Sequence, residues 1–164
     1  MPHQRLLDSF QKYHITYQLH THPAVFTVEA SDELRGVIEG AHSKNLFLRD
    51  KKKKYFLVST LSTKRVDLKA LSKNFGNGHF SFGNAEELFT FLGVIPGSVT
   101  PYGLIHDQEH HVTFLLDKEL LNDDLVNFHP LRNDMTVSVC PSQFLAFFEK
   151  IGCKPQIIDV PALV

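Results

Sequence analysis

The spacing of apolar residues along the chain predicts helices that alternate with short strands. The first apolar positions recur at helical spacing and predict a helix of about ten residues: Leu6, Leu7, Phe10 and Tyr13. Ile15–His20 then alternates between apolar and polar residues, which predicts a strand. Thr27 precedes an acidic first turn, so we expect it to cap a second helix that continues through Leu34 and ends near Gly36–Gly40.

A hairpin follows in the pattern. Asn45–Leu48 and Tyr55–Val58 are strand-like, and Asp50 and the four lysines Lys51–Lys54 separate them. The lysine run is interpreted as an exposed hairpin tip. A solvated turn is favoured over a contact with RNA, because most charge runs are solvated surface.

The second half of the chain carries clear helix boundaries. Asp67–Phe75 predicts one helix, and Asn84 caps another that Gly93 terminates. Pro141 starts a helix that runs to about Ile151 and ends at Gly152. Further strands are predicted at Phe80–Phe82, His111–Leu116, Val126–Phe128, Thr136–Val139 and Gln156–Val160. Hairpins mixed with helices predict an α/β fold with a mixed sheet rather than a doubly wound one.

Length and composition fit one domain over residues 1–164. The chain has 43% hydrophobic residues and no repeat or linker. Its net charge of −1 excludes a generally basic nucleic-acid coat protein, although a local basic patch could still meet an RNA end. Cys140 and Cys153 are expected to be free thiols, with Cys140 in the core. With no leader-like or membrane-spanning run, we expect a soluble cytoplasmic protein.

The segment Gly93–Leu104 is rich in glycine and proline, with Ser98 and Thr100 between them. Such a segment cannot form a helix interior or a central strand. Its prolines fix backbone angles, and its glycines allow close approach or a positive φ. We therefore expect an ordered loop that can hold backbone N–H groups around a small ligand.

Most of the usual catalytic and metal signatures are absent from the sequence. It has no G-x-S-x-G, H-E-x-x-H, G-x-G-x-x-G or P-loop motif. His20 and His22 could share a face of an extended chain, but no third metal ligand is obvious. His110 and His111 would point to opposite faces of a strand. We therefore predict no metal and no cofactor.

Two other side chains could carry chemistry. Lys44 stands at the expected entrance to an apolar strand, where its ammonium could bind a phosphate or polarise an ester carbonyl. His129 precedes Pro130 at a strand end, so its imidazole could bond a substrate or simply close the turn. For Lys44 alone a solvated side chain is favoured, because most lysines are solvated, whereas the residues leave both interpretations of His129 open.

Four segments taken in order resemble the YbaK/prolyl-tRNA-synthetase-associated domain family of trans-editing enzymes. They are His22–Thr27, Ser43–Leu48, Gly93–Leu104 and His129–Asn133. Within the family they are most similar to the free-standing PrdX (ProXp-ala type) branch. The resemblance implies a single α/β domain with a curved mixed sheet flanked by helices. It also implies hydrolysis of alanine wrongly attached to proline tRNA, while correctly charged prolyl-tRNA is spared.

The resemblance also implies roles for particular residues. Lys44 matches the lysine that the family needs for deacylation, and the catalytic set expected with it is Gly97, Ser98 and His129. From the character of the loop itself, we expect backbone N–H groups around Gly97–Val99 to stabilise the oxyanion. We also expect Pro96, Pro101 and neighbouring apolar side chains to keep the pocket too small for a proline ring. The expected substrate-binding residues are Thr27, Asn45, Gly93, Pro96, Val99, Thr100, Pro101 and Asn133.

The expected partners are the tRNA acceptor end and, with it, prolyl-tRNA synthetase. The protein is expected to be a monomer with no membrane partner. Two alternatives stay open from the sequence. One is the same fold acting on cysteinyl-, seryl- or threonyl-tRNA, and the other is a non-catalytic module that binds tRNA or a synthetase. A small-molecule pocket unrelated to tRNA is a third.

Overall fold

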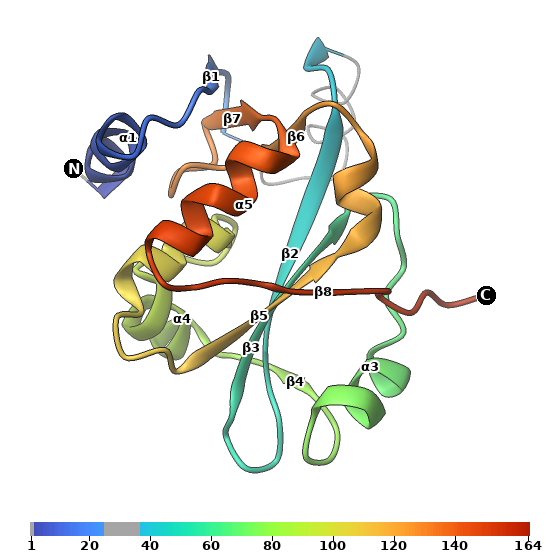
Figure 1. The fold of residues 1–164 in the computed structure, drawn as a ribbon. Helices are drawn as coiled ribbons and strands as arrows, with labels where there is room; N and C mark the ends of the chain where they lie inside the picture. The colour runs from blue at the N-terminus through green and yellow to red at the C-terminus, as the bar shows by residue number, and fades with distance from the viewer. Residues whose placement is uncertain (1, 25–36) are drawn as a thin grey trace.

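The computed structural model describes residues 2–24 and 37–164, and these contain one open, eight-stranded mixed sheet with helices packed against it (Figure 1). The strands are β1 (Gln18–Thr21), β2 (Ala41–Arg49), β3 (Tyr55–Leu61), β4 (Ser81–Phe82), β5 (Val112–Asp117), β6 (Val126–Phe128), β7 (Met135–Val139) and β8 (Gln156–Ile158). Their order is β1-β7-β6-β2-β3-β5-β8, and β4 pairs with β2. The predicted mixed α/β fold is confirmed.

Four α-helices and two 3₁₀ helices connect these strands in the described part of the chain. The α-helices are α1 (Pro2–Lys12), α3 (Leu68–Phe75), α4 (Ala85–Leu92) and α5 (Pro141–Lys150). The 3₁₀ helices are η1 (Pro101–His106) and η2 (Lys118–Asn122). None of the helices in these described ranges has the length and apolar content needed to cross a bilayer.

Strand β2 is the central element, and its two edges are used differently. Along one edge it pairs with β3 over seven residues, from Ser43 to Arg49. Along the other it pairs in parallel with β6 only at Ala41 and His42, and with β4 only at Leu48 and Arg49. Between these two short ladders no described strand pairs with this edge of β2. The sheet therefore opens into a fork where β2 and β6 separate.

One face of the sheet is apolar and carries the main core. Alternate residues of five strands point to it, and α1, α4, α5 and η1 cover it. Tyr102 of η1 lies at its centre and is 1% exposed. Its ring packs against five phenylalanines of the core at centroid distances of 5.4–6.1 Å: Phe10, Phe128, Phe144, Phe147 and Phe148. The core is therefore built largely from aromatic rings.

The opposite face is divided between an apolar and a polar half. Near the β2–β3 hairpin, α3 packs Leu71 against Leu48, Phe56 and Val58 in a second, smaller apolar cluster. Toward the other end of β2, the side chains on this face are polar. The candidate site lies in that polar half.

Helix ends that the sequence marks with local signals are confirmed. Asn84 and Glu87 form a capping box at the start of α4, and Gly93 ends that helix in the left-handed conformation with φ of 68°. Pro141 occupies the first turn of α5. These boundaries depend only on residues close in sequence, which is why the pattern finds them.

Strand β1 starts at Gln18 rather than at the expected Ile15. His14, with φ of 58°, and Ile15 end α1, because their N–H groups donate to the carbonyls of Gln11 and Phe10. Ile15 then packs in the core beside Phe10. The alternating pattern that predicted a strand thus starts at Ile15, which belongs to the end of α1.

Other boundaries also differ from the prediction. Strand β5 begins at Val112, so the expectation of a strand that holds His110 and His111 is wrong. Asp107 accepts the N–H groups of His111 and Val112, and it holds that turn in place. Cys140 is half-buried before α5 rather than in the core. Both 3₁₀ helices were missed, and β8 ends at Ile158. The helix predicted from Thr27 lies outside the described residues.

We expect Tyr102→Ala to lower the free energy of unfolding by about 3–5 kcal/mol, because it removes a fully buried ring from the aromatic core. Urea unfolding followed by circular dichroism measures this. Ile95→Ala in the same loop is the control. Ile95 is 60% exposed, and its loss should change stability by no more than about 0.5 kcal/mol. Equal effects of the two substitutions would contradict the central place of Tyr102 in the core.

Candidate active site

The register of β2 and β6 brings Lys44 and His129 to equivalent positions. The last parallel pair of the two strands is His42 with Asn127. Lys44 and His129 each follow that pair by two residues. Because side chains two residues apart in a strand share a face, both lie on the polar face, one on each side of the fork. Lys44 is the fourth residue of β2, so the expectation that it stands at the strand entrance is wrong.

His129 is oriented by the turn between β6 and β7. Its Nδ1–H donates to the carbonyl of Met135 at 2.7 Å, so its Nε2 carries the lone pair when the ring is neutral. Its ring lies 6.0 Å from that of His22. Burial lowers the pKa of His129, the nearby His22 and His42 lower it further, and the bond to Met135 and the charge of Asp134 only partly oppose this. A neutral imidazole with an accepting Nε2 is therefore favoured. The sequence left open whether His129 bonds a substrate or closes the turn. The bond from Nδ1 to Met135 shows that it closes the turn.

A network of buried polar side chains lines the same face beside the fork. The hydroxyl of Ser138 accepts from Nε2 of His20 at 3.1 Å and donates to Oδ1 of Asn127. The amide group of Asn127 donates to the carbonyls of Glu39 and Ala41 at 2.9 and 3.2 Å. Asn127 and Ser138 are 2% and 1% exposed, so this network is part of the interior. It fixes the start of β2 against β6 and β7.

His22, which follows β1, also lies on this face. Its ring nitrogens lie 2.8 Å from the Pro23 carbonyl and 2.8 Å from the Thr136 hydroxyl. The expectation that His20 and His22 share a face is confirmed, because His20 pairs with Thr136 in the ladder and His22 bonds the same residue. We call the following set the histidine face: His20, His22, His42, Lys44, Asn127, His129, Thr136 and Ser138.

Lys44 is half-buried, and its surroundings leave its charge without a close carboxylate in the described residues. Burial lowers the pKa of Lys44, and the positive charge of Arg65 lowers it further. The nearest buried acid on this face, Asp117, accepts from the Thr60 hydroxyl at 2.5 Å and pairs with Lys64 at 2.7 Å. The negative charge of Asp117 is therefore already paired with the charge of Lys64. A partly dehydrated ammonium of this kind interacts more strongly with an anion or an ester oxygen than a fully solvated one.

Asn45 points away from Lys44, although the two are adjacent in sequence. Oδ1 of Asn45 accepts from the hydroxyl of Ser59 at 2.5 Å. Asn45 shares its side of β2 with Phe47, which belongs to the main core. Lys44 and Asn45 therefore lie on opposite faces of the sheet. They can contact the same ligand only if it sits in the opening between β2 and β6.

The glycine- and proline-rich loop is ordered by a tight turn. The N–H of Ser98 donates to the carbonyl of Ile95 at 3.0 Å, and Gly97 has a φ of 92°. Proline at the second position and a positive φ at the third define a type II turn, which explains Pro96 and Gly97. Pro96 is exposed, and Ser98 is 4% exposed. The N–H of Ser98 is thus already used within the turn.

Three other loop positions also have structural tasks. Thr100 is fully buried, and its hydroxyl accepts from the N–H of Tyr102 at 3.3 Å, which caps η1. Pro101 is buried in the first turn of η1. A side chain at Gly93 would meet His106, since an added Cβ would lie 2.7 Å from its Nδ1. Bracing of the loop therefore accounts for Gly93, Thr100 and Pro101.

The loop approaches the fork from the apolar side of the sheet. Val94 and Tyr102 belong to the main core, and Tyr102 packs against Phe128, the residue before His129. Lys44 and His129 lie on the other side. Asn133 lies in the turn after β6, next to the ion pair of Arg132 with Asp134. Thr27 lies outside the described residues.

Sequence reasoning did not find the polar network of Asn127, Thr136 and Ser138. One signal was present, because Asn127 is a lone amide between Val126 and Phe128 in an apolar strand. In residues 2–24 and 37–164, no group of three or more metal-ligating side chains is arranged to hold a metal ion.

Comparison with known proteins places this chain in a family. The model of the aminoacyl-tRNA editing domain matches residues 22–147, which include β2, the loop and His129. This chain belongs to the aminoacyl-tRNA editing domain family. The match spans the whole of the fork and most of the histidine face.

Relatives and a solved structure agree with this membership. The chain is 39% identical to prolyl-tRNA synthetase associated domain-containing protein 1 of Xenopus laevis, over 94% of this chain and 95% of that protein. It is 31% identical to the prolyl-tRNA editing protein ProX of Acetoanaerobium sticklandii, over 82% of each. A crystal structure described as a candidate trans-editing enzyme for prolyl tRNA synthetase has the same fold, with a TM-score of 0.75 at 21% identity over 99% of both chains.

The lowered pKa of His129 in this editing domain predicts how its stability depends on pH. The unfolded state binds the extra proton at a higher pH than the folded state does, so this contribution to stability is present above about pH 6.5. It is lost as the pH falls from there toward the pKa of the folded state. We expect His129→Asn, which keeps a donor for the Met135 carbonyl, to show a shallower loss of stability on acidification.

Urea unfolding near neutral pH and at about pH 5 measures the difference between the two proteins. His79→Asn is the control, because His79 is exposed, and it should follow the parent protein. The assignment is wrong if His129→Asn and the parent lose stability in parallel.

Proposed function

We propose that the protein hydrolyses the ester of alanine attached to proline tRNA and spares prolyl-tRNA. The observation that carries this proposal is the placement of Lys44 and His129 on the two sides of the fork between β2 and β6. Family membership and relatives named for prolyl-tRNA editing support the substrate class. The resemblance of the sequence motifs to the free-standing PrdX branch points to alanine.

The reaction requires little more than positioning and charge stabilisation. Water forms a new bond to the ester carbonyl carbon, and the bond from that carbon to the ribose oxygen breaks. The ribose oxygen takes up one proton, and the carboxylic acid product releases the other to solvent. An aminoacyl ester is already activated, so a precise site can act without a strong nucleophile.

Lys44 would stabilise negative charge at the fork. Its half-buried ammonium can contact the developing oxyanion or the phosphate of the terminal adenosine. His129 would present its accepting Nε2 to the attacking water or to a ribose hydroxyl. This lets a neutral imidazole guide the proton, while Nδ1–H stays bonded to the Met135 carbonyl.

The loop would meet the carbonyl from the other side of the fork. Because the Ser98 N–H bonds Ile95, the oxyanion donors expected there reduce to the N–H groups of Gly97 and Val99. The type II turn fixes the N–H of Gly97, and the N–H of Val99 follows directly after that turn. Rejection of proline would be steric, since a clash with a fixed backbone costs more than the 1–3 kcal/mol of one methylene in an apolar pocket.

We expect Lys44→Ala to lower kcat/KM for alanyl-tRNA(Pro) by about 100-fold or more, the range seen when one group that stabilises an oxyanion is removed. Release of labelled alanine from the charged tRNA measures it. Lys150→Ala is the matched control, because Lys150 is exposed at the end of α5. Near-normal turnover by a folded Lys44→Ala protein would overturn the proposal.

The choice of amino acid is tested with one set of charged tRNAs. We expect the unaltered protein to hydrolyse alanyl-tRNA(Pro) and to leave prolyl-tRNA(Pro) at least about 100-fold more stable, as exclusion by clash permits. If the protein prefers cysteinyl-, seryl- or threonyl-tRNA, the proposed reaction stands but the amino acid that it removes is not alanine. Hydrolysis of none of them would favour a module that binds without catalysis.

A further inference from the structure

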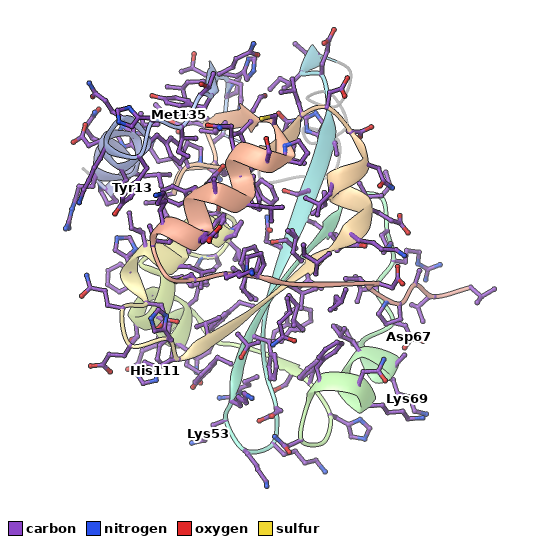
Figure 2. The ribbon with its side chains drawn as sticks, in the orientation of Figure 1. Tyr13, Lys53, Asp67, Lys69, His111 and Met135 are labelled. Carbon is purple, nitrogen blue, oxygen red and sulfur yellow. The ribbon has the colours of Figure 1, made fainter. Side chains whose placement is uncertain are left out.

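A hollow at the far end of β2 is lined by three lysines and a histidine. It has a volume of about 320 Å³ and lies between the β2–β3 hairpin, α3 and the loop after α3. Its lining includes Lys51, Lys69, Lys73 and His79. Figure 2 shows Lys53 at the hairpin tip and Lys69 on α3 at the same end of the molecule, with Met135 at the opposite end. Sequence alone had favoured a plain solvated turn here.

Asp50 holds this end of the molecule in a defined shape. It is 4% exposed, and its carboxylate accepts the N–H groups of Lys52 and Lys54 in the hairpin tip. It also accepts both the backbone and side-chain N–H groups of Asn77, in the loop after α3. Burial alone would raise the pKa of Asp50, but these hydrogen bonds outweigh it and the pKa is lowered. One ionised carboxylate thus fastens the lysine-bearing tip to the other wall of the hollow.

The lysines are also placed individually. An added Cβ at Gly78, whose φ is 88°, would lie 2.6 Å from Cδ of Lys51, so the absence of a side chain there leaves room for the Lys51 stem. Lys69 and Lys73 are four residues apart on α3, so they share a face of that helix. Leu71 on the opposite side anchors α3 in the smaller core.

These lysines are concentrated at one end of the molecule. We define the basic surface as six of the chain's 17 lysines and arginines: Lys51, Lys52, Lys53, Lys54, Lys69 and Lys73. All six are exposed, and none forms a salt bridge with a residue that the structure describes. The net charge of the chain is only −1. A separate hollow at the start of β2 is acidic, with Glu39, Asp123 and Asp124 in its lining.

We propose that the basic surface binds the sugar-phosphate backbone of the tRNA acceptor stem. Regularly spaced phosphates are the ligand that best fits a cluster of exposed lysines held on an ordered hairpin and helix. The acidic hollow at the other end of β2 would repel the same backbone and so give the RNA one orientation.

The position of the basic surface relative to the fork agrees with this. Lys44 and the small core under α3 lie on the same face of β2, since Lys44, Leu46 and Leu48 alternate along it. At about 3.3 Å per residue, the hairpin tip lies about 20 Å along β2 from Lys44. A tRNA carries its ester at the end of a short single-stranded tail, so its paired stem stays at a distance from the reacting bond. The orientation rests on the proposed function, whereas binding of the stem does not.

The test measures binding of an uncharged RNA hairpin that reproduces the acceptor stem and its 3′ tail. Fluorescence anisotropy with the full chain gives the affinity at salt concentrations from about 50 to 200 mM. We compare Lys51→Ala/Lys69→Ala/Lys73→Ala with a matched triple variant, Lys12→Ala/Lys150→Ala/Lys154→Ala. Both variants lose three exposed charges, so both have the same net charge.

We expect the first variant to lose at least about tenfold in affinity and to lower the salt slope by about one per lysine. The matched variant should stay within about twofold of the parent. Equal losses in the two variants, or none in the first, would overturn the proposal. The second outcome would also direct attention to a protein partner for this surface.

A second measurement separates this proposal from the proposed function. Hydrolysis of a minimal ester, alanine on a short 3′-terminal oligonucleotide without a stem, should be equal in the parent and in both variants. With the full tRNA, the first variant should show a raised KM and an unchanged kcat. If the parent hydrolyses neither substrate, the function fails while the binding result still decides this inference.

Discussion

The structure of the site depends on one constraint, which is the short ladder between β2 and β6. The two strands exchange hydrogen bonds at only two positions, and their backbones then separate. Polar backbone groups left without a partner strand are costly unless side chains or water satisfy them. The hydroxyl of Ser43 meets part of this need, because it donates to the carbonyl of Asn127 at 2.8 Å across the opening. The end of the β2–β6 ladder thus favours polar side chains, because they can hydrogen-bond the backbone groups left without a partner strand.

The buried polar residues of the histidine face follow from that gap. Asn127 bonds two carbonyls near the start of β2, and Ser138 links it to His20. Every buried side-chain nitrogen or oxygen in the described residues has a partner. Such a satisfied network fixes the positions of its members, whereas a half-satisfied one would favour unfolding. Lys44 and His129 therefore stand on a rigid support, which is what a reaction that relies on positioning requires.

Local signals in the sequence predicted the helices and the mixed sheet and singled out Lys44 and His129, but they could not predict that these two side chains share one site. The capping box of α4 and the proline of α5 are read from neighbouring residues. The equivalence of Lys44 and His129 instead depends on a pairing between residues 42 and 127, and no short window of sequence contains both. The same limit applies to the hairpin tip. Its four lysines look like a solvated turn until Asp50 is seen to bind Asn77, 27 residues away.

The separation of the basic surface from the histidine face has an electrostatic reason. The electrostatic influence of His22 and His42 already lowers the pKa of His129, and lysines placed there would lower it further and make Nε2 a weaker base. The Debye length at physiological salt is about 8 Å, so exposed charges about 20 Å away along β2 are largely screened from the fork. Lysines at the hairpin can therefore attract a polyanion without changing the protonation of His129. The basicity of Nε2 of His129 is then set by the histidine face alone, and the charge of the hairpin lysines does not reduce it.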